Sequence, residues 1–448
     1  MTFAQKSSNN TKRYHIITFG CQMNEHDSEK ISGILESKGF EHSQEPEGAN
    51  LLIINTCSIR KKAEDKFYSQ IGRFKTLKKK NPDLKIGVVG CIAQQEGDRI
   101  LKRYSHVDFI LGTMELNRLL QEDPLMLKDV HTDMHNTMPD IGLAKRKSPV
   151  KALVNIMYGC NNFCSYCIVP YTRGQEKSRA ASAIIKEIQD LSQKGYKEVI
   201  LLGQNVNSYK SNGTDFVTLL EMINEIDGIE RIRFMTSHPK DLSEGLIDAF
   251  ERLDKLCEHI HLPLQSGSSR ILQLMNRKYD YDYYFNLILR LKDKVPDISI
   301  TTDIITGFPY ETEEDHQQTL KALKEIRFDG IFSFKYSKRP GTMASSYGGQ
   351  INEEVKEKRL AEINKLQDVI TDEKNRELQG KIIEVLIDDK SDKAQFDYMG
   401  RSRTNKIVYI KSNKTLDIGD IINVKIENPK RHSLEGIYNE GISSHNRL

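Results

Sequence analysis

The sequence predicts an α/β protein with a parallel α/β sandwich at the N-terminus, a partial (β/α)6 barrel in the centre and a small antiparallel β-barrel at the C-terminus. Three observations predict this fold class. In the N-terminal third, apolar runs of strand length recur about every 35 residues, the length of a βαβ unit. In the centre, six such runs alternate with helical patterns, and near the C-terminus short alternating segments are separated by turns.

The composition restricts the classes of protein to which this chain can belong. Its 448 residues suffice for several domains, and a net charge of +3 excludes a chain that binds nucleic acid over its whole surface. No window of about 18 apolar residues is present, and residues 1–13 are polar and predicted to be a disordered tail. We therefore expect a cytoplasmic protein without a membrane segment, in which clustered cysteines are metal ligands or catalytic groups rather than disulfides.

The N-terminal domain is predicted over residues 14–127. Strand-like runs begin at Tyr14, Ala49 and Lys85, and helical patterns separate them. Continuous apolar strands that are joined by helices indicate a parallel sheet covered on both faces.

Cys21, Cys57 and Cys91 follow the ends of these three runs. All strands of a parallel sheet end at the same edge, where ligands bind, so the topology brings these cysteines together. One interpretation is a [4Fe–4S] cluster with three thiolate ligands and one open iron. The alternative is three unrelated cysteines that pack as small hydrophobic residues, which is also our interpretation of the isolated Cys257.

The central domain is predicted over residues 152–376, after an inter-domain linker over residues 128–151 that lacks periodicity. Six repeats are too few for a closed eight-stranded barrel and fit an open, partial one. The loops that follow the strands carry the site in such folds. The strand-like segments are residues 152–158, 198–206, 231–237, 259–266, 298–308 and 330–337.

A compact cysteine triplet follows the first of these strands. The stretch from Tyr158 to Gly174 reads YGCNNFCSYCIVPYTRG and contains Cys160, Cys164 and Cys167. Three thiolates in so short a loop can converge on one metal centre and leave a position open, as in a [4Fe–4S] cluster with one free iron. A structural zinc site is the alternative, but it needs a fourth Cys or His, which this stretch lacks.

The triplet resembles the signature of the radical S-adenosylmethionine (SAM) enzymes. This resemblance implies that the free iron binds the amino and carboxylate groups of SAM. It also implies that the reduced cluster splits SAM into methionine and a 5′-deoxyadenosyl radical, and that the central domain has the partial-barrel fold.

The N-terminal motifs narrow the resemblance. TFGCQMNEHDSE (18–29), INTCSIRKKAEDK (54–66) and VGCIAQQ (89–95) are similar to the N-terminal domain of the methylthiotransferases, a branch of the radical-SAM superfamily. GCQMNEHDSE and the triplet stretch most resemble the MiaB type, the tRNA-2-methylthio-N6-dimethylallyladenosine synthases. The RimO-type enzymes, which act on a ribosomal protein, tend to read GCPKN at the first site, and the enzymes for threonylcarbamoyl-adenosine tend to read GCKVN. The resemblance extends from about Tyr14 to the C-terminus.

Polar and small residues stand at the ends of the later central strands. Their side chains could hold the amino acid, ribose and adenine parts of SAM. The alternative is that they are ordinary turn residues. The predicted SAM contacts are Gly203, Gln204, Asn205, Ser237, Gln265 and Asp303.

The C-terminal domain is predicted over residues 377–448, after a long charged helix over residues 351–380. It resembles the TRAM domain, an RNA-binding unit of many methylthiotransferases. Basic residues interleaved with Tyr398 and Tyr409 could bind phosphates and stack bases, and an ordinary solvated surface is the alternative. The predicted RNA contacts are Arg401, Arg403, Lys406 and Lys411.

The methylthiotransferase resemblance implies a division of labour between the two cysteine sets. The triplet would hold the SAM-cleaving cluster, and the N-terminal cysteines would hold an auxiliary cluster whose free iron carries the sulfur to be transferred. One SAM would methylate that sulfur, and a second would yield the radical that abstracts the hydrogen from C2 of adenine. The implied substrate is N6-isopentenyladenosine next to the anticodon in tRNA, in an exposed single-stranded loop.

Two alternatives stay open at the level of sequence. The same chemistry could act on a ribosomal-protein aspartate or on threonylcarbamoyl-adenosine, or the chain could be a non-enzymatic, metal-stapled RNA-binding protein. The expected partners are the tRNA anticodon stem-loop and a reducing protein such as flavodoxin. We expect a monomer, and the sequence does not identify the sulfur donor.

Overall fold

The computed structural model describes residues 11–58, 61–134 and 142–439. It divides into two units. The N-terminal unit comprises residues 1–147, 158–160 and 168–177, and the C-terminal unit comprises residues 148–157, 161–167 and 178–448. Residues 1–10 of the predicted tail, residues 135–141 of the predicted linker and residues 440–448 lie outside the described residues. The predicted domain boundaries remain predictions, although the central domain and the β-barrel fall into one unit here.

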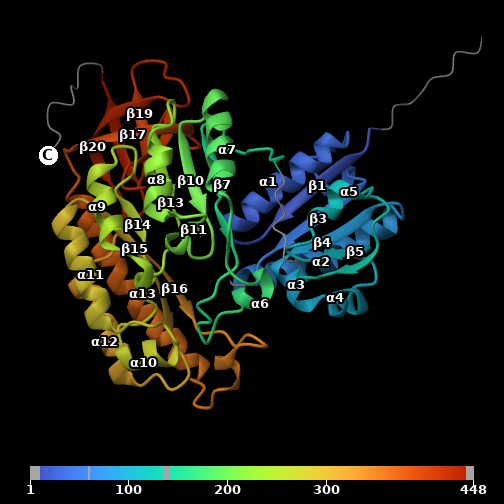
Figure 1. Ribbon diagram of the computed structural model, residues 1–448, viewed down its shortest axis with the longest axis horizontal. Coiled ribbons are helices and arrows are strands. Elements are labelled where there is room, and N and C mark those ends of the chain that lie inside the picture. Colours follow the sequence, from blue (N-terminus) through green and yellow to red (C-terminus); the bar gives the residue numbers. More distant parts are fainter. Residues whose placement is uncertain (1–10, 59–60, 135–141, 440–448) are drawn as a thin grey trace, which may run out of the picture. The chain divides into compact units, whose positions relative to one another are not determined.

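The N-terminal unit contains the predicted parallel sheet, and Figure 1 shows its strands side by side in blue to cyan. Its strand order is β2-β1-β3-β4-β5-β6, and every pair of neighbours is parallel. The last strand, β6, lies inside the stretch predicted as linker. The strands are β1 (Arg13–Thr18), β2 (Glu41–His42), β3 (Leu51–Thr56), β4 (Lys85–Gly90), β5 (Phe109–Leu111) and β6 (Asp129–His131).

Helices cover both faces of this sheet, as the continuous apolar strands predict. Along β3, Leu51 and Ile53 belong to one apolar cluster and Leu52 and Ile54 to the other, because successive strand side chains point to opposite faces. The first cluster includes residues of α1, and the second includes residues of α2. The helices of this unit are α1 (Gln22–Ser37), α2 (Lys61–Lys80), α3 (Cys91–Glu96), α4 (Asp98–Arg103), α5 (Arg118–Gln121) and α6 (Val169–Arg173).

The C-terminal unit contains the six predicted barrel strands, in two parallel sheets of three. The orders are β13-β10-β7 and β14-β15-β16, so each sheet follows the chain. A single bridge from Ile232 to Leu256, outside the ladders, links β13 to the segment before β14. The strands are β7 (Lys151–Asn155), β10 (Glu198–Leu202), β13 (Arg231–Phe234), β14 (His259–His261), β15 (Ser299–Thr306) and β16 (Gly330–Lys335).

Helices follow these strands, and polar N-cap residues start five of them. The side chains of Asp215, Ser243, Ser268, Asp280 and Thr312 each accept a backbone N–H of the first turn, which satisfies a donor that the helix itself leaves unpaired. The apolar faces of these helices pack on the strands in one continuous core. The helices are α7 (Ala181–Gln193), α8 (Phe216–Asn224), α9 (Glu244–Arg252), α10 (Ser269–Leu274), α11 (Tyr281–Lys294), α12 (Glu313–Ile326) and α13 (Glu353–Arg376).

The C-terminal end of this unit is the predicted small β-barrel, closed in the order β17-β18-β19-β21-β20. The prediction that it is antiparallel is wrong at one pair, because β19 and β21 run parallel. A ring of five strands cannot alternate direction at every neighbour, so one pair must be parallel. The strands are β17 (Ile382–Lys390), β18 (Tyr398–Ser402), β19 (Ile407–Ser412), β20 (Ile421–Pro429) and β21 (Leu434–Tyr438).

Short elements complete the described chain. They are β8 (Met157–Tyr158), β9 (Lys177–Ser178), the β11–β12 hairpin (Lys210–Ser211 and Thr214–Asp215) and 3-10 turns at Pro46–Gly48, Val206–Ser208, Pro239–Asp241 and Met343–Ser346. No helix within the described ranges is long and apolar enough to span a membrane.

Candidate active site

The three cysteines of the N-terminal unit lie at the ends of neighbouring parallel strands. Cys21 is the N-cap of α1, Cys57 directly follows β3 and Cys91 is the first residue of α3. Cys57 and Cys91 are buried and Cys21 is half-buried. The Cys21 and Cys57 thiols are hydrogen-bonded, and Cys91 is close enough to Cys21 for their charges to interact. The topology therefore brings together the set that the strand ends predict.

Glycine permits this close approach of the strand ends. Gly90 has φ +94°, and a Cβ placed there would lie 2.6 Å from the carbonyl oxygen of Thr56. A Cβ at Gly20 would lie 2.7 Å from the Cβ of Cys57. Because real Cβ contacts are not that short, any larger residue would push the ends of β1, β3 and β4 apart.

Asn24 and Asn55 join the start of α1 to the end of β3. The Asn24 amide donates to Asn55 Oδ1 and to Thr56 O, both at 3.0 Å, and Asn55 Nδ2 donates to Asn24 O at 2.8 Å. The Cys21 thiol donates to Asn24 Oδ1 at 3.4 Å. These two buried amides fix Cys21 relative to Cys57.

Arg173 is a residue of this site that the sequence analysis does not predict, although it stands in the YTRG end of the triplet stretch. Its guanidinium is buried and donates to Asp27 Oδ2 at 2.9 Å. The pKa of Cys21 is lowered to about 6, first by the hydrogen bond with Cys57 and then by the charge of Arg173, against the effect of burial. Burial raises the pKa of Cys91, and Arg173 opposes that rise. The site thus contains a buried cation beside thiols that can become thiolates.

The triplet occupies a loop anchored by its own backbone. The Cys167 N–H donates to the Cys164 carbonyl at 3.0 Å, and the Cys160 N–H donates to the Gly174 carbonyl at 3.1 Å. Ser165 holds the loop on α10, because its N–H donates to Met275 O at 3.0 Å and its hydroxyl to Leu274 O at 2.8 Å. Within the described residues, no three His, Cys, Asp or Glu side chains are grouped closely enough to hold a metal ion. The ligand roles of both trios therefore stay predictions.

Four of the predicted SAM contacts carry buried polar atoms that lack a hydrogen-bond partner among the described residues. These atoms are both amide atoms of Gln204, Asn205 Oδ1, Ser237 Oγ and Gln265 Oε1, and His238 Nε2 shares the property. They follow the ends of β10, β13 and β14. Buried polar atoms are nearly always paired, so a group of unpaired ones at one end of a barrel indicates a polar ligand.

The backbone is strained at the same strand ends. Thr236 and Gln265 have φ of +69° and +74°, a region that is costly for side chains other than glycine and most of all for a β-branched residue. Such strain clusters at ligand sites. It favours a binding role for the loops after β13 and β14.

Gly203 and Asp303 have another explanation. A Cβ at Gly203 would lie 2.4 Å from Met157 Cγ, so tight packing requires glycine there. Asp303 lies 3.5 Å from His261 Nε2, and its backbone carbonyl accepts the Gln265 N–H at 2.9 Å. Both residues thus have a structural role, and their predicted contact with SAM stays a prediction.

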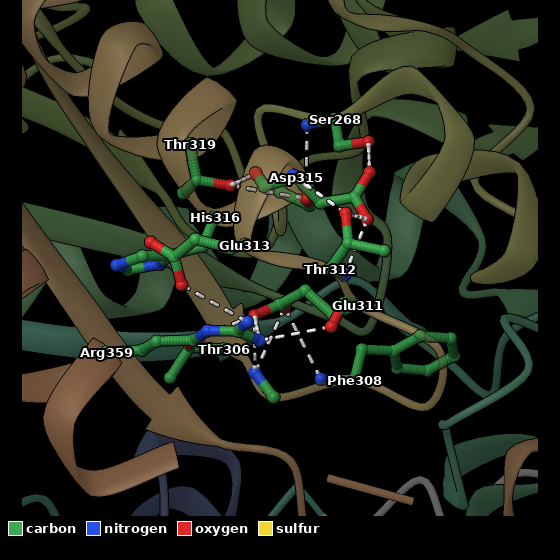
Figure 2. A network of polar contacts seen from close by, with 12 residues as sticks. Ser268, Thr306, Phe308, Glu311, Thr312, Glu313, Asp315, His316, Thr319 and Arg359 are labelled. Atoms are coloured by element: carbon green, nitrogen blue, oxygen red, sulfur yellow. Dashed lines mark hydrogen bonds and ion pairs between the residues drawn. The ribbon is translucent and has the colours of Figure 1, made fainter. Parts of the chain in front are cut away.

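A polar network joins Ser268, the N-cap of α10, to the start of α12 (Figure 2). Asp315 at the start of α12 accepts hydrogen bonds from Ser268 Oγ at 2.6 Å and Thr312 Oγ1 at 2.8 Å. Burial opposes ionisation of Asp315, but these bonds and those from Arg270 lower its pKa to about 2. In the same view Glu311 accepts from Arg359 at 2.9 Å and from the Gly307 N–H at 3.0 Å.

Two of the four residues predicted to contact RNA form ion pairs inside the C-terminal unit instead. Arg403 forms a bidentate ion pair with Glu258, with a shortest contact of 2.7 Å, and Lys406 lies 3.2 Å from Asp329 Oδ1. These side chains join the β-barrel to the partial barrel, which sequence periodicity cannot reveal. The direct RNA role predicted for them is therefore not supported.

The remaining basic and aromatic residues of the barrel differ in accessibility. Lys411 is exposed, and Arg401 is half-buried with a bond from its guanidinium to the Asn405 carbonyl at 3.2 Å. Tyr398 is buried in the barrel core, so it cannot stack on a base. Tyr409 packs against Phe396 and lies under the Lys393 ammonium.

Comparison with known proteins identifies the chain. Residues 13–112 match the Uncharacterized protein family UPF0004, residues 154–323 the Radical SAM superfamily and residues 376–438 the TRAM domain. A tRNA-2-methylthio-N(6)-dimethylallyladenosine synthase from Thermodesulfovibrio yellowstonii is 55% identical over 94% of this chain and 97% of its own length. One from Carboxydothermus hydrogenoformans is 48% identical over 95% of this chain and 99% of its own. The chain belongs to the MiaB-type methylthiotransferase family.

Solved structures share the fold of this methylthiotransferase. The radical S-adenosylmethionine methyltransferase TsrM from Kitasatospora setae has a TM-score of 0.54 at 12% identity, over 72% of each chain. The cobalamin-dependent S-adenosylmethionine radical enzyme OxsB has a TM-score of 0.51 at 12% identity, over 80% of this chain and 56% of its own. At such identity the likeness concerns the fold alone, and it confirms the predicted α/β class.

Family membership confirms the resemblance carried by GCQMNEHDSE and the triplet stretch. It makes the chain an enzyme whose cofactors are SAM and [4Fe–4S] clusters.

Proposed function

We propose that this methylthiotransferase adds a methylthio group to C2 of N6-isopentenyladenosine next to the anticodon in tRNA, using two SAM molecules and two [4Fe–4S] clusters. The observation that carries the proposal is the convergence of Cys21, Cys57 and Cys91 in a chain that also contains the triplet. An enzyme that only cleaved SAM would need the triplet alone. Relatives that bear this activity in their names cover nearly the whole chain.

We assign Cys160, Cys164 and Cys167 to the cluster that binds and cleaves SAM, and the N-terminal trio to the auxiliary cluster. When bound, the clusters supply the electron for SAM cleavage and a site for the sulfur that is transferred. The protein contributes thiolates held at fixed strand ends. Because Cys21 has a lowered pKa, it is ready to ligate at neutral pH.

We assign Gln204, Asn205, Ser237 and Gln265 to SAM. Each has a buried polar atom without a partner in the described part of the chain, which costs about 1–3 kcal/mol until a ligand satisfies it. Burial and the charges of Arg277 and Lys240 lower the pKa of His238 to about 2, so the imidazole stays neutral. Its Nδ1 accepts the Lys240 N–H at 3.2 Å, so Nε2 carries the ring proton and can donate it to a ligand. The set therefore suits the uncharged ribose and adenine as well as the polar amino-acid end of SAM.

We assign tRNA binding in part to the barrel, through Lys411 and the accessible part of Arg401. Single-stranded anticodon loops present unstacked bases, so the target adenine can be splayed out into the active site. We place the reaction in the cytoplasm, where tRNA is modified, with a monomeric enzyme and a flavodoxin-type reductant.

Nucleoside mass spectrometry tests this proposal. The anaerobically reconstituted chain, incubated with SAM, reductant and tRNA that carries N6-isopentenyladenosine, should convert that nucleoside to its 2-methylthio form. Unmodified tRNA without the isopentenyl group is the matched control and should not react. Methylthio transfer to a ribosomal-protein aspartate or to threonylcarbamoyl-adenosine, with isopentenyladenosine unchanged, would contradict the substrate assignment.

A further inference from the structure

Arg277 lies between α10 and α11 in the C-terminal unit, and its guanidinium is buried, with 4% of the residue exposed. Nη1 donates to Cys164 Sγ at 3.3 Å and lies 3.4 Å from the Tyr166 hydroxyl. Nη2 donates to the Pro263 carbonyl at 3.1 Å, and Nε donates to the Tyr279 hydroxyl at 2.9 Å. The ring of Tyr279 packs against the guanidinium at 5.2 Å.

None of these partners is a carboxylate, and Arg277 is unusual in that respect. Five other buried arginines among the described residues each contact a carboxylate at 2.8 or 2.9 Å. They are Arg173 with Asp27, Arg179 with Glu187, Arg231 with Glu384, Arg233 with Glu198 and Arg359 with Glu311. Within the described residues, Arg277 has no such ion pair. A buried charge without an opposite charge is unfavourable, so its position indicates an anion that binds beside it.

The donor direction identifies that anion. Nη1 points at Cys164, one of the three thiols assigned to the SAM-cleaving cluster, and Tyr166 lies between Cys164 and Cys167 in sequence. A [4Fe–4S] cluster held by three thiolates is anionic overall, and it gains further negative charge on reduction. Hydrogen bonds to the cluster sulfurs and the charge around it set its reduction potential.

We propose that Arg277 is a positioning residue of the SAM-cleaving cluster, which donates a hydrogen bond to the Cys164 thiolate and compensates the charge of the reduced cluster. The inference rests on the proposed role of the triplet. A positive charge stabilises the reduced state more than the oxidised state, because the reduced cluster is the more negative. Arg277 therefore raises the reduction potential and eases electron entry before SAM is cleaved.

Potentiometric titration followed by electron paramagnetic resonance tests the inference on the full chain, reconstituted anaerobically and titrated without SAM. The signal that changes when SAM is then added marks the relevant cluster. Arg277→Gln should lower the ratio of reduced to oxidised cluster at a fixed potential about tenfold, equivalent to about 59 mV for one electron. Arg277→Lys retains the charge and should recover most of that loss.

Tyr279→Phe is the matched control, because it removes an acceptor of the guanidinium but leaves its charge, and it should leave the ratio unchanged. A wild-type ratio in Arg277→Gln at full iron content would overturn the inference. So would a variant in which only the SAM affinity falls, because Arg277 would then bind the SAM carboxylate instead. Loss of iron from both Arg277→Gln and Arg277→Lys would also overturn it, since lysine retains the charge.

The same experiment separates this inference from the proposed function. If the wild-type chain shows no iron–sulfur signal that responds to SAM, the role of the triplet fails. If the wild type shows that signal and the Arg277 variants match it, the triplet role stands and the Arg277 inference fails.

Discussion

Each of the two cysteine sites contains a buried arginine, but only one of these arginines is paired with a carboxylate among the described residues. In the N-terminal unit, Arg173 lies beside Cys21 and Cys91 and is neutralised by Asp27 at 2.9 Å. In the C-terminal unit, Arg277 lies beside Cys164 with hydroxyl, carbonyl and thiol partners only, as far as the described residues go. The first site is electrostatically complete without a cofactor. The second becomes complete only when an anionic group binds, so its stability and its cofactor are coupled more tightly.

The largest effects are expected from substituting one cysteine of each trio, because the two trios are assigned to different steps of the reaction. Cys160→Ala should abolish SAM cleavage, whereas Cys57→Ala should spare cleavage and stop methylthio transfer. We expect each lost activity to fall more than about 100-fold, because losing a ligand costs more than the 10–100-fold of an outer-shell change. Deoxyadenosine and methylthio-nucleoside are quantified in the same reaction.

Cys257→Ala is the control for both variants. Cys257 is a buried cysteine that lies far from both trios in sequence, and it has no assigned role. It should retain both products. Normal methylthio transfer by Cys57→Ala would remove the auxiliary-cluster assignment and with it the distinction between the sites.

The second prediction concerns a variant, Asp27→Asn, in which the buried arginine of the N-terminal site also lacks a carboxylate partner. Asp27→Asn leaves Arg173 buried without its carboxylate, and breaking a buried ion pair costs about 3–5 kcal/mol. The iron-free variant should therefore melt at a lower temperature than iron-free wild type in calorimetry. Reconstitution with iron and sulfide should recover part of the difference, because the anionic cluster replaces the lost charge.

Asp98→Asn, an exposed substitution at the start of α4, is the matched control and should change neither melting temperature. An unchanged melting temperature of iron-free Asp27→Asn would show that Asp27 does not compensate Arg173.

The third prediction concerns pH and the influence of Arg277 on His238. Burial and then the Arg277 charge hold the folded-state pKa of His238 at about 2, below the value of about 6.5 for an unfolded chain. The unfolded state therefore takes up a proton first, and stability is lost as pH falls from about 6.5 towards 2. Between pH 7 and pH 5 this amounts to about 2 kcal/mol from His238 alone.

Denaturant unfolding at pH 7 and pH 5 measures this loss. His238→Gln should remove that part of the pH dependence, whereas Arg277→Gln should leave it nearly unchanged, because burial is the largest cause of the lowered pKa and keeps it well below 5. Equal pH dependence in wild type and His238→Gln would contradict a neutral, buried His238.

The smallest effect is expected for an arginine that is compensated but partly exposed. Arg403→Ala removes the bidentate pair with Glu258 and should lower the free energy of unfolding by about 1–2 kcal/mol, reduced from a buried value by solvent screening. Lys411→Ala should leave stability unchanged and weaken tRNA binding at low salt. Chemical denaturation measures the stability, and filter binding measures the tRNA affinity. Unchanged stability and weaker tRNA binding in Arg403→Ala would instead show that Arg403 contacts RNA.

Much of the fold and the cysteine sets could be predicted because their signals are local. Apolar runs ending at Cys21, Cys57 and Cys91 predict parallel strands, and parallel strands share an edge. The triplet is visible because three thiols within one loop leave few other interpretations. The polar strand ends predict Gln204, Asn205, Ser237 and Gln265 as SAM contacts, and each has a buried polar atom without a partner among the described residues, but the binding role itself stays a prediction.

The sequence by itself therefore determined the elements, their order and the cysteine sets, because periodicity and spacing are properties of short segments. Only the tertiary structure decided that Arg173 meets Asp27, that Arg277 meets Cys164, and that Arg403 faces Glu258. Each of these contacts joins residues more than 100 positions apart. Which charge is compensated and which is left for a cofactor depends on such distant pairs, and no local pattern encodes them.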